Sequence, residues 1–554
     1  MRKFIIVTIY FLVFWNIIPF LIIAISNRLD LYLNFKQSPF TYSGYFVLMV
    51  SVLLLGISIW EYYKYTGNLP VSAYPPGHII RRGIYNYWRH PIYLFYITTF
   101  IGIALLIGSL AMLLLVIPFF IVLTFIYIVF EEKGLTRRFG ETYIYYKKQT
   151  GLIIPHPYQI MRYPLLALFK VLFRYQSVNS DLIPGSPPYF IIAEHKNYLD
   201  PFFIALTIPH PISYLTTYEV YRSKIIKWFL RNFFSISKKR FKADLASNRC
   251  VLEVLNKGGI IGLFPEGERS WTGETQNFKP EVMKFLLKKI EIPILPVRIE
   301  GNYHSWPRWA NAFRRCKIIV EIREPFYPDS GSSADELETR IRNSIGKSQF
   351  PDKFPGRASD FYDGLDKVLY RCSNCREFNS FNIRQNTLTC KNCGLELKVS
   401  PDLVIHLLQD GSERAISIAE YYRSIKVTLE DPLLKKKNKV VGHGFDQEDI
   451  IVDLKESGMC QLFAETADDF QLLLNGKLVL SETSIIFRNE SNDLLLNYSD
   501  ISSITTESNC KLQLYNHVTR QLYQVTFLKN NVLQWQDIIT SIILLKTGRS
   551  INTR

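Results

Sequence analysis

Two short polar segments carry residue types that can perform proton and group transfer. His195 and Asp200 stand with four residues between them, directly after the apolar run 189–193. A neutral imidazole can take a proton from a hydroxyl, and a carboxylate on its other ring nitrogen fixes the tautomer and stabilises the imidazolium. Such a pair activates a hydroxyl for attack on a thioester without a serine or cysteine nucleophile. Alone, this spacing is weak evidence, because most such pairs are surface accidents.

The second segment, 264–270, reads Phe-Pro-Glu-Gly-Glu-Arg-Ser and also follows an apolar run. Gly267 permits a tight backbone turn, and Arg269 can bind a phosphate through two parallel hydrogen bonds. Glu266 can hold a basic side chain or a substrate hydroxyl. A basic cluster lies between the two segments, with a solvated basic face as its alternative interpretation; it comprises Lys238, Lys239, Arg240 and Lys242.

Together these residues resemble the glycerophospholipid acyltransferase family, which contains the 1-acylglycerol-3-phosphate acyltransferases. The four family blocks are matched in order by 194–201, by 239–240, by 264–270 and by 294–297. The resemblance implies an α/β domain in which His195 is the general base and Asp200 its partner. It also implies an acyl-CoA or acyl-carrier-protein donor and a lysophospholipid acceptor, with the acceptor phosphate held by Lys239, Arg240, Glu266, Gly267 and Arg269.

Three positions depart from the family pattern. Glu194 stands where an Asn is usual, Asn197 replaces a Ser, and Glu268 replaces a Thr. Two extra carboxylates beside a phosphate site are expected to repel a phosphate dianion, which weakens the case for lysophosphatidate as the acceptor. A catalytically dead acyltransferase fold is the alternative.

A second set of ionisable and aromatic residues flanks the apolar stretch 91–130. Segment 83–93 reads Gly-Ile-Tyr-Asn-Tyr-Trp-Arg-His-Pro-Ile-Tyr, and two glutamates, a Phe-Gly pair and two tyrosines follow the stretch. A helical hairpin over 91–130 brings both ends to one membrane surface, where the basic and acidic groups form a polar cup. Ordinary interface anchoring is the alternative.

This order and spacing resemble the integral membrane methyltransferases, the group of isoprenylcysteine carboxyl methyltransferase and phospholipid N-methyltransferase. In that family the cup binds S-adenosylmethionine: a carboxylate suits its ammonium group, and Arg or His suits its carboxylate. The resemblance implies a cofactor site made of Arg89, His90, Tyr93, Glu131 and Glu132. A membrane anchor descended from a methyltransferase is the alternative.

Four of the eight cysteines form two tight pairs with fourteen residues between them: Cys372, Cys375, Cys390 and Cys393. Two such pairs can place four thiolates tetrahedrally around one zinc ion. No open ligand position is indicated, so the zinc is expected to be structural. The segment has few basic or aromatic side chains, so no nucleic-acid partner is expected, and a small stability or interaction module is the preferred interpretation.

Three apolar segments, 4–26, 45–60 and 91–130, are expected to position the cup. The last is twice the length of a span and breaks near Gly108, which predicts four transmembrane helices in all. Lysines and arginines between the second and third helices, and after the fourth, place both termini and the catalytic domains in the cytoplasm. A signal peptide is the alternative for the first segment.

From about 160 to 350, short apolar strands alternate with helices, which predicts an α/β domain. The expected strands are 189–193, 259–264 and 292–299, and the expected helices 245–255 and 280–288. Strands 470–474, 478–480, 484–487, 494–498, 512–515 and 523–527 follow, with a turn at Asn475-Gly476 and a closing helix over 535–545. This pattern resembles the pleckstrin-homology or GRAM superfold.

The expected fold is multidomain. Its parts are a transmembrane methyltransferase-like domain (1–155), an α/β acyltransferase domain (156–350), a zinc ribbon (365–400) and a β-rich domain (401–554) that is pleckstrin-homology- or GRAM-like from about 465. The net charge of +16 favours anionic partners, and the apolar N-terminus directs that choice to membrane phospholipids. The sequence therefore predicts a membrane acyltransferase that also binds S-adenosylmethionine. Two rivals are a methyltransferase with a vestigial acyltransferase domain and a non-enzymatic lipid-sensing scaffold.

Overall fold

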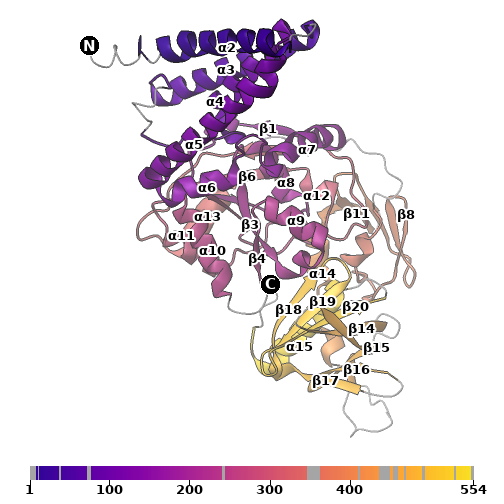
Figure 1. The fold of residues 1–554 in the computed structure, drawn as a ribbon. Helices are drawn as coiled ribbons and strands as arrows, with labels where there is room; N and C mark the ends of the chain where they lie inside the picture. Colours follow the sequence, from indigo (N-terminus) through magenta and orange to yellow (C-terminus); the bar gives the residue numbers. More distant parts are fainter. Residues whose placement is uncertain are drawn as a thin grey trace.

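The computed structural model describes residues 8–9, 11–35, 39–70, 77–239, 244–345, 362–409, 412–435, 450–452, 459–466, 469–489, 493–528 and 532–550. Apolar helices are followed by an α/β part, a small sheet that carries the paired cysteines, and a β-rich C-terminal part (Figure 1). The chain is therefore multidomain, as the sequence predicts.

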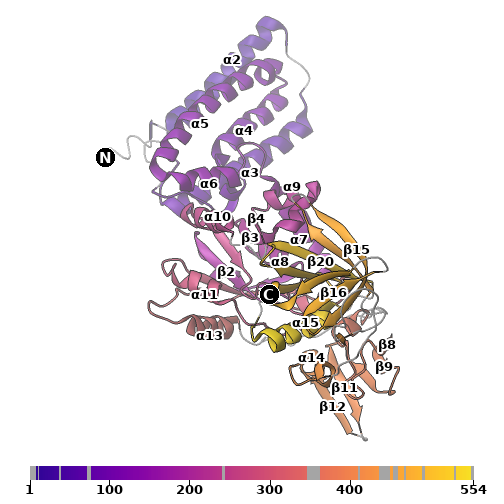
Figure 2. The ribbon, with the colours of Figure 1, turned by 90° about the horizontal axis from the view of Figure 1, so that it is seen from below.

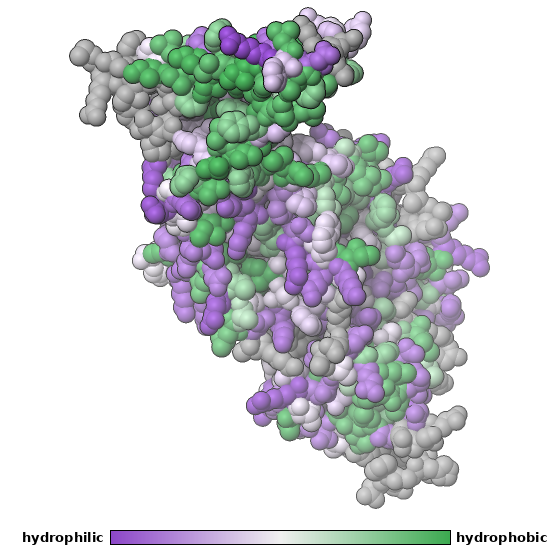
Figure 3. Space-filling model, in the orientation of Figure 1, coloured by the Kyte–Doolittle hydropathy of each residue, from purple (hydrophilic) through white to green (hydrophobic). Residues whose placement is uncertain are grey.

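The N-terminal part contains the apolar helices α2 (Ile18–Leu33), α3 (Thr41–Thr66), α4 (Pro91–Ile107) and α5 (Ile117–Phe139). Three stretches are long and apolar enough to cross a membrane: Val13–Leu33, Thr41–Thr66 and Met112–Phe139. The third expected span, α4, is apolar but has only 17 residues. Apolar side chains cover the outside of these helices (Figure 3), which suits contact with lipid.

The apolar hairpin turns at the expected position. Gly108 ends α4 with a φ of 68°, a left-handed conformation that glycine adopts without steric cost. Glycines also bring α3 and α4 together, since a Cβ on Gly44 would lie 2.8 Å from the Leu106 side chain. A Cβ on Gly102 would lie 2.7 Å from the Leu48 backbone nitrogen. Only glycine permits this approach, so α4 is held against a spanning helix along its length.

The helices α6 (Glu141–Gln149) and α7 (Pro157–Phe173) lead into a seven-stranded sheet of order β1-β7-β6-β2-β5-β3-β4. Its strands are β1 (Gln176–Val178), β2 (Tyr189–Ala193), β3 (Ile212–Thr217), β4 (Ile236–Lys238), β5 (Ile260–Leu263), β6 (Ile294–Glu300) and β7 (Ile319–Ile322). Every neighbouring pair is parallel except β6–β7. The three strands expected here are confirmed, to within two residues at each end.

Helices cover both faces of this sheet, which is why β2 reads as five consecutive buried residues. Alternate β2 side chains enter two different clusters: one with α7 and α8 (Asp200–Thr207), the other with α10 (Leu245–Asn256), α11 (Pro280–Leu287) and α13 (Ala334–Ile345). The remaining helices are α9 (Lys224–Asn232) and the short α12 (Asn302–Ser305). The central strands are thus fixed from both sides, and so are the loops that leave them.

The paired cysteines belong to a five-stranded antiparallel sheet of order β12-β11-β10-β9-β8. Its strands are β8 (Phe381–Arg384), β9 (Thr387–Cys390), β10 (Glu396–Val399), β11 (Val404–Gln409) and β12 (Ser412–Ser417), and α14 (Ile418–Ile425) follows. Because β11 pairs with β10, the sheet continues past residue 400, the expected end of the ribbon.

The C-terminal sheet has the order β17-β16-β15-β14-β20-β19-β18, with β13 (Ile450–Val452) on β15. Its strands are β14 (Met459–Glu465), β15 (Phe470–Ser481), β16 (Ser484–Arg488), β17 (Asp493–Asn497), β18 (Ile501–Glu507), β19 (Lys511–Asn516) and β20 (Gln521–Phe527), closed by α15 (Val532–Thr547). The expected closing helix is confirmed, and Trp535 stacks on Phe527 with ring centroids 5.7 Å apart.

The hairpin turn expected at Asn475-Gly476 is wrong. Both residues lie inside the continuous strand β15, where Asn475 pairs with Gln461 and Gly476 with Cys460. A Cβ on Gly476 would lie 2.1 Å from the carbonyl oxygen of Arg488. The glycine therefore does not form a turn. It permits two strands to approach closely, which is another common role of glycine within a strand.

Candidate active site

The parallel strands bring the sequence blocks to one edge of the central sheet. His195 follows β2, the 264–270 loop follows β5, and Lys239 follows β4. Since β2, β5, β3 and β4 all run in the same direction, their carboxyl ends meet at that edge, where α/β sheets bind ligands. The fourth block, 294–297, lies inside the sheet as part of β6, beside β2. This block therefore supports β2, the strand that precedes His195.

The His195 imidazole and the Asp200 carboxylate form a hydrogen-bonded pair. Nδ1 of His195 lies 3.0 Å from Oδ2 of Asp200, and the imidazole stacks on the Phe264 ring with centroids 4.3 Å apart. Burial lowers the pKa of His195, the Asp200 charge opposes that shift, and Arg269 adds to it. The ring is thus neutral at neutral pH. With Nδ1 occupied, Nε2 is the nitrogen available to accept a proton, and 20% of the side chain is exposed.

Four donors satisfy the Asp200 carboxylate, which is completely buried. Besides His195, the backbone N–H groups of Lys196 and Asn197 each donate to Oδ2 at 2.8 Å, and Nδ2 of Asn302 donates to Oδ1 at 2.9 Å. A buried carboxylate with this many donors is fixed in place. Sequence reasoning missed Asn302, which follows β6 and has no local pattern that marks it.

Asn197, one of the departures from the family pattern, supports the same region. Its side-chain Nδ2 donates to the carbonyl of Asn302 at 2.8 Å and to the Ser305 hydroxyl at 2.7 Å. Its Oδ1 accepts the backbone N–H of Leu199. The amide therefore joins the loop after β2 to α12, a link between two elements about a hundred residues apart in sequence.

Glu266 holds the backbone of the catalytic pair. Its buried carboxylate accepts the backbone N–H of His195 at 2.8 Å through Oε2 and that of Gln276 at 3.1 Å through Oε1. The backbone N–H of Ser270 donates to the His195 carbonyl at 2.9 Å. Burial raises the pKa of Glu266 to about 8, despite these donors. Glu266 thus connects the loop after β5 to the loop after β2 through its hydrogen bond with the His195 backbone.

Arg269 lies beside the pair with an unused donor. Its guanidinium carbon sits 3.2 Å from the centre of the Tyr198 ring, and burial, with Arg308 nearby, lowers its pKa to about 10. Among the residues that the structure describes, no atom accepts a hydrogen bond from its buried Nη1. A buried, unpaired guanidinium donor next to a general base is what an anionic substrate group requires. The turn that presents it depends on Gly267, whose φ is 80°.

The two unexpected carboxylates are both paired with cations. Glu194 lies 2.8 Å from the Lys196 ammonium and also bonds the Thr275 hydroxyl. Glu268 accepts from Nη1 of Arg308 at 3.1 Å. Because both charges are compensated by cations of the protein, the repulsion of a phosphate dianion that the sequence predicts is reduced.

Of the predicted basic block, only part lies in the described residues. Lys239 is exposed, its backbone N–H donates to Asp244 at 2.8 Å, and its ammonium lies 5.9 Å from the centre of the Tyr218 ring. Arg240 and Lys242 lie outside the described residues. Lys239 shares the sheet edge with His195 and Arg269.

The predicted cup forms where the two ends of the apolar hairpin meet. Nε of Arg89 lies 2.5 Å from Oε1 of Glu132, and the Lys147 ammonium bonds the same carboxylate. His90 lies 3.6 Å from Glu131 through Nδ1 and stacks on Tyr93 with centroids 5.7 Å apart. The hairpin therefore brings together the residues that the sequence predicts to form the cup.

A cavity of about 350 Å³ opens beside this cluster. Arg89, His90, Tyr93 and Glu131 line it, with aromatic and apolar residues that include Tyr62, Ile80, Tyr127, Tyr143 and Tyr146. Glu132 is not among the lining residues and instead fixes Arg89 from behind. The volume lies within the roughly 300–1,000 Å³ of small-molecule sites, and the lining offers both a carboxylate and cations. These residues fit S-adenosylmethionine.

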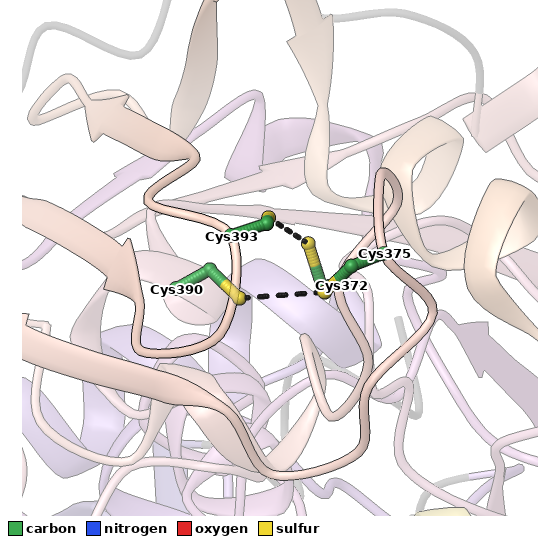
Figure 4. Close-up of side chains that lie close together, drawn as sticks. All are labelled: Cys372, Cys375, Cys390 and Cys393. Carbon is green, nitrogen blue, oxygen red and sulfur yellow. Dashed lines mark hydrogen bonds between the residues drawn. The ribbon is translucent and has the colours of Figure 1, made fainter.

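The four cysteines converge on one point (Figure 4). All four sulfurs lie within 4.8 Å of one another, with Cys372–Cys393 at 3.6 Å and Cys375–Cys390 at 3.7 Å. A tetrahedral site with Zn–S bonds of roughly 2.3 Å puts its sulfurs ~3.8 Å apart, so the spacing fits zinc. None of the four forms a disulfide.

Comparisons with known proteins match two parts of the chain. Residues 174–300 match the acyltransferase family model, and residues 40–142 match the phospholipid methyltransferase family model. The chloroplastic 1-acyl-sn-glycerol-3-phosphate acyltransferase BAT2 of Brassica napus is 24% identical over 170 residues, which are 30% of this chain and 48% of that protein. The 1-acyl-sn-glycerol-3-phosphate acyltransferase of Saccharomyces cerevisiae is 27% identical over 28% of this chain and 54% of its own.

The match therefore spans about half the length of these curated relatives. Among solved structures, the 1-acyl-sn-glycerophosphate acyltransferase of Thermotoga maritima matches with 24% identity and a TM-score of 0.31, over 34% of this chain and 76% of that one. The family models therefore match the acyltransferase and methyltransferase resemblances seen in the sequence, each on its own segment. The chain therefore joins a segment that matches the phospholipid methyltransferase family model to a segment that matches the acyltransferase family model.

Proposed function

We propose that this protein is a membrane-bound O-acyltransferase. It transfers an acyl group from acyl-CoA or acyl-carrier protein to the free hydroxyl of a lysophospholipid such as 1-acylglycerol-3-phosphate. The observation that carries the proposal is a neutral His195, fixed by Asp200 at 3.0 Å, beside the buried Arg269 with an unpaired donor. The match of residues 174–300 to the acyltransferase family supports it.

The reaction needs one proton relay. Nε2 of His195 takes the proton of the acceptor hydroxyl while that oxygen attacks the thioester carbonyl. Asp200 stabilises the imidazolium that forms, and its four donors hold the ring in orientation. The tetrahedral intermediate then collapses, the carbon–sulfur bond breaks, and the leaving thiolate takes the proton from His195. The new ester and a free thiol are the products.

The acceptor phosphate binds on the side of Arg269. Its unpaired Nη1 is the donor assigned to the phosphate, and Lys239, which follows β4, is the second cation of the proposed site. Because Glu194 and Glu268 are each paired with a cation, lysophosphatidate remains a suitable acceptor.

The experiment is labelled acyl transfer to a panel of lysolipids by the full chain in vesicles. The panel contrasts a bare phosphate headgroup with phosphocholine and with monoacylglycerol, and each acceptor is offered acyl-CoA and acyl-carrier protein. We expect wild type to prefer the phosphate headgroup and Arg269→Met to lose that preference. Transfer to every acceptor at the same rate contradicts the assigned phosphate site, and no transfer to any acceptor contradicts the function.

A second function, methyl transfer to a lipid headgroup or lipid-like acceptor, is supported by the cavity beside His90 and Glu131 and by the methyltransferase family match. S-adenosylmethionine, when bound, supplies the methyl group. Glu131 would hold its ammonium group, Arg89 and His90 would hold its carboxylate, and Glu132 orients Arg89. Equilibrium binding of labelled S-adenosylmethionine tests this: Glu131→Gln is expected to weaken binding, whereas His195→Ala is expected to leave it unchanged. Equal affinity in wild type and Glu131→Gln contradicts the site.

The remaining parts support the two sites. The four helices cross the membrane with α4 as the short third span, and the catalytic domains lie in the cytoplasm. The parts are the methyltransferase-like domain (1–155), the acyltransferase domain (156–350), a zinc-bearing domain from 365 that extends to about 435 because its sheet continues, and a C-terminal domain. The strand order of that last domain, two meanders joined through β14 and β20 with a closing helix, supports a pleckstrin-homology- or GRAM-like fold.

A further inference from the structure

The helix α9 is amphipathic, yet much of its apolar side is exposed. Its sequence, Lys-Ile-Ile-Lys-Trp-Phe-Leu-Arg-Asn over Lys224–Asn232, contains three cations and no acidic residue. Lys224, Lys227 and Arg231 recur at helical spacing and share one face. The adjoining face carries Ile225 and Trp228, which are 81% and 55% exposed. Large apolar side chains in this arrangement require a partner.

The opposite edge of α9 is fixed to the catalytic domain. Phe229 stacks on Phe233 with centroids 4.2 Å apart and contacts Phe202 of α8 at 5.8 Å. Phe233 in turn contacts Tyr158 of α7 at 5.2 Å. The exposed side chains are therefore presented by a rigid helix, and that helix packs on α8, which begins at the catalytic Asp200.

The membrane helices define where the bilayer surface runs relative to α9. Arg81, which precedes α4, donates to the carbonyls of Gly258 at 2.7 Å and Thr142 at 2.8 Å. The His210 Nε2–H donates to the Arg81 carbonyl at 2.6 Å, so the soluble domain is tied to the ends of the membrane helices. Figure 2, in which those helices run up the picture, shows α9 at the level of their lower ends.

We propose that α9 is an interfacial helix that inserts Ile225 and Trp228 into the headgroup region of the bilayer. Lys224, Lys227 and Arg231 then meet the phosphates of anionic lipids. An apolar edge flanked by basic residues is the pattern of helices that lie in the membrane interface. Through Phe229 and α8, this contact sets the height of the His195–Asp200 pair above the leaflet that supplies the acceptor. The last step rests on the proposed acyltransferase function.

A direct test is site-specific photocrosslinking of the full chain in vesicles of phosphatidylcholine and phosphatidylglycerol that contain labelled phospholipid. A benzophenone amino acid replaces Ile225 in one variant, Val518 in a second, and Phe119 in a third. Val518, in the turn between β19 and β20, is 65% exposed, and Phe119 is 64% exposed on α5. We expect lipid adducts from positions 225 and 119 and none from 518. Adducts from 119 but none from 225, or protein adducts from 225, would overturn the proposal. This readout does not depend on catalysis.

The consequence for catalysis is tested with two acceptors of the same headgroup. One is a long-chain lysolipid embedded in vesicles, and the other is a short-chain analogue that dissolves as a monomer. We expect the double variant Ile225→Glu/Trp228→Glu to lose about tenfold or more of its rate with the embedded acceptor, because apolar contact with the interface is lost. Its rate with the soluble acceptor should equal that of wild type, and Val518→Glu should match wild type with both.

The outcomes separate the two claims. Equal loss with both acceptors, or no loss with either, overturns the role of α9 while leaving the acyltransferase function standing. If wild type acylates neither acceptor, the proposed function fails, and the crosslinking result alone then decides whether α9 contacts lipid.

Discussion

At the scale of residues, the proposed chemistry depends on the few hydrogen-bonding groups of the site that the described residues leave available to a substrate. The Asp200 carboxylate is saturated, whereas His195 keeps one nitrogen and Arg269 keeps one donor for the substrate. The sequence pattern indicates these three residues because they lie within the blocks that resemble the acyltransferase family. Asn302 and Arg308 were not identified, since each acts through a contact with residues far away in the chain.

The lowered pKa of His195 has a direct kinetic consequence. The general base must be neutral, so acyl transfer is expected to proceed above this pKa and to fall as pH drops below it. Because Asp200 raises that pKa against the effect of burial, Asp200→Asn is expected to move the acid limb to lower pH. It should also reduce kcat by on the order of 10⁴, since the tautomer is no longer fixed. The pH profile of kcat/KM measures both effects, and an acid limb that moves to higher pH contradicts this role of Asp200.

At the scale of elements, the loop after β5 is held by the C-terminal sheet as well as by its own strand. Arg308 is almost fully buried, donates to Glu268 at 3.1 Å and to the Arg269 carbonyl at 3.0 Å, and also bonds the Thr506 carbonyl of β18. Its guanidinium lies 4.7 Å from the centre of the Trp271 ring. Arg269, the proposed phosphate-binding residue, is thus positioned in part by a contact with the C-terminal sheet.

Arg308→Met is expected to raise KM for the phosphate-bearing acceptor more than it lowers kcat, because Arg269 loses its support. It should also destabilise the protein by roughly 3–5 kcal/mol, since Glu268 is left buried without a partner. Adding Glu268→Gln should recover part of that stability. Acceptor kinetics and thermal unfolding measure the two effects. Arg323→Met, which breaks the 3.0 Å pair with Glu321 on β7, is the matched control and should leave KM unchanged. An equal KM change in both variants argues against positioning.

The cysteine-bearing sheet shares one core with the C-terminal sheet and with Trp271, so loss of metal is expected to reach the active site. We expect one zinc ion per chain by elemental analysis. Cys390→Ser, or strong chelation, should lower both the melting temperature and acyl transfer, because metal binding at four thiolates is coupled to folding. Cys250→Ser, at an exposed cysteine outside the cluster, should change neither. Full stability without zinc contradicts a structural role.

At the scale of the whole molecule, the chain joins two candidate sites, one beside the apolar N-terminal helices and one at the edge of the central sheet. The periodicity of the apolar residues was sufficient to predict the hairpin, the central strands and the closing helix. It failed at Asn475-Gly476, where a local turn signal stands inside a long strand whose partners decide its conformation. It could not predict how the C-terminal sheet packs on the catalytic loop, because contacts such as Arg308–Thr506 join residues about 200 positions apart.

Two catalytic sites in one chain should also be separable. We expect His195→Ala to lower acyl transfer by roughly 10²- to 10⁴-fold and to retain S-adenosylmethionine binding. We expect Glu131→Gln to weaken that binding and to retain acyl transfer, because the two clusters share no residue. Paired assays of both variants in the same vesicles measure this. Loss of both functions in either variant means that the sites are coupled, and the description of two independent sites is then wrong.

The central claim is tested most directly by acyl transfer from acyl-CoA or acyl-carrier protein to vesicle-embedded lysophosphatidate by wild type and His195→Ala. Retained S-adenosylmethionine binding or an unchanged melting temperature shows that the variant is folded. The account predicts labelled phosphatidate with wild type and a rate lower by roughly 10²- to 10⁴-fold with the variant. Equal rates in the two proteins would contradict His195 as the general base, and no product from wild type with either donor would contradict the acyltransferase function.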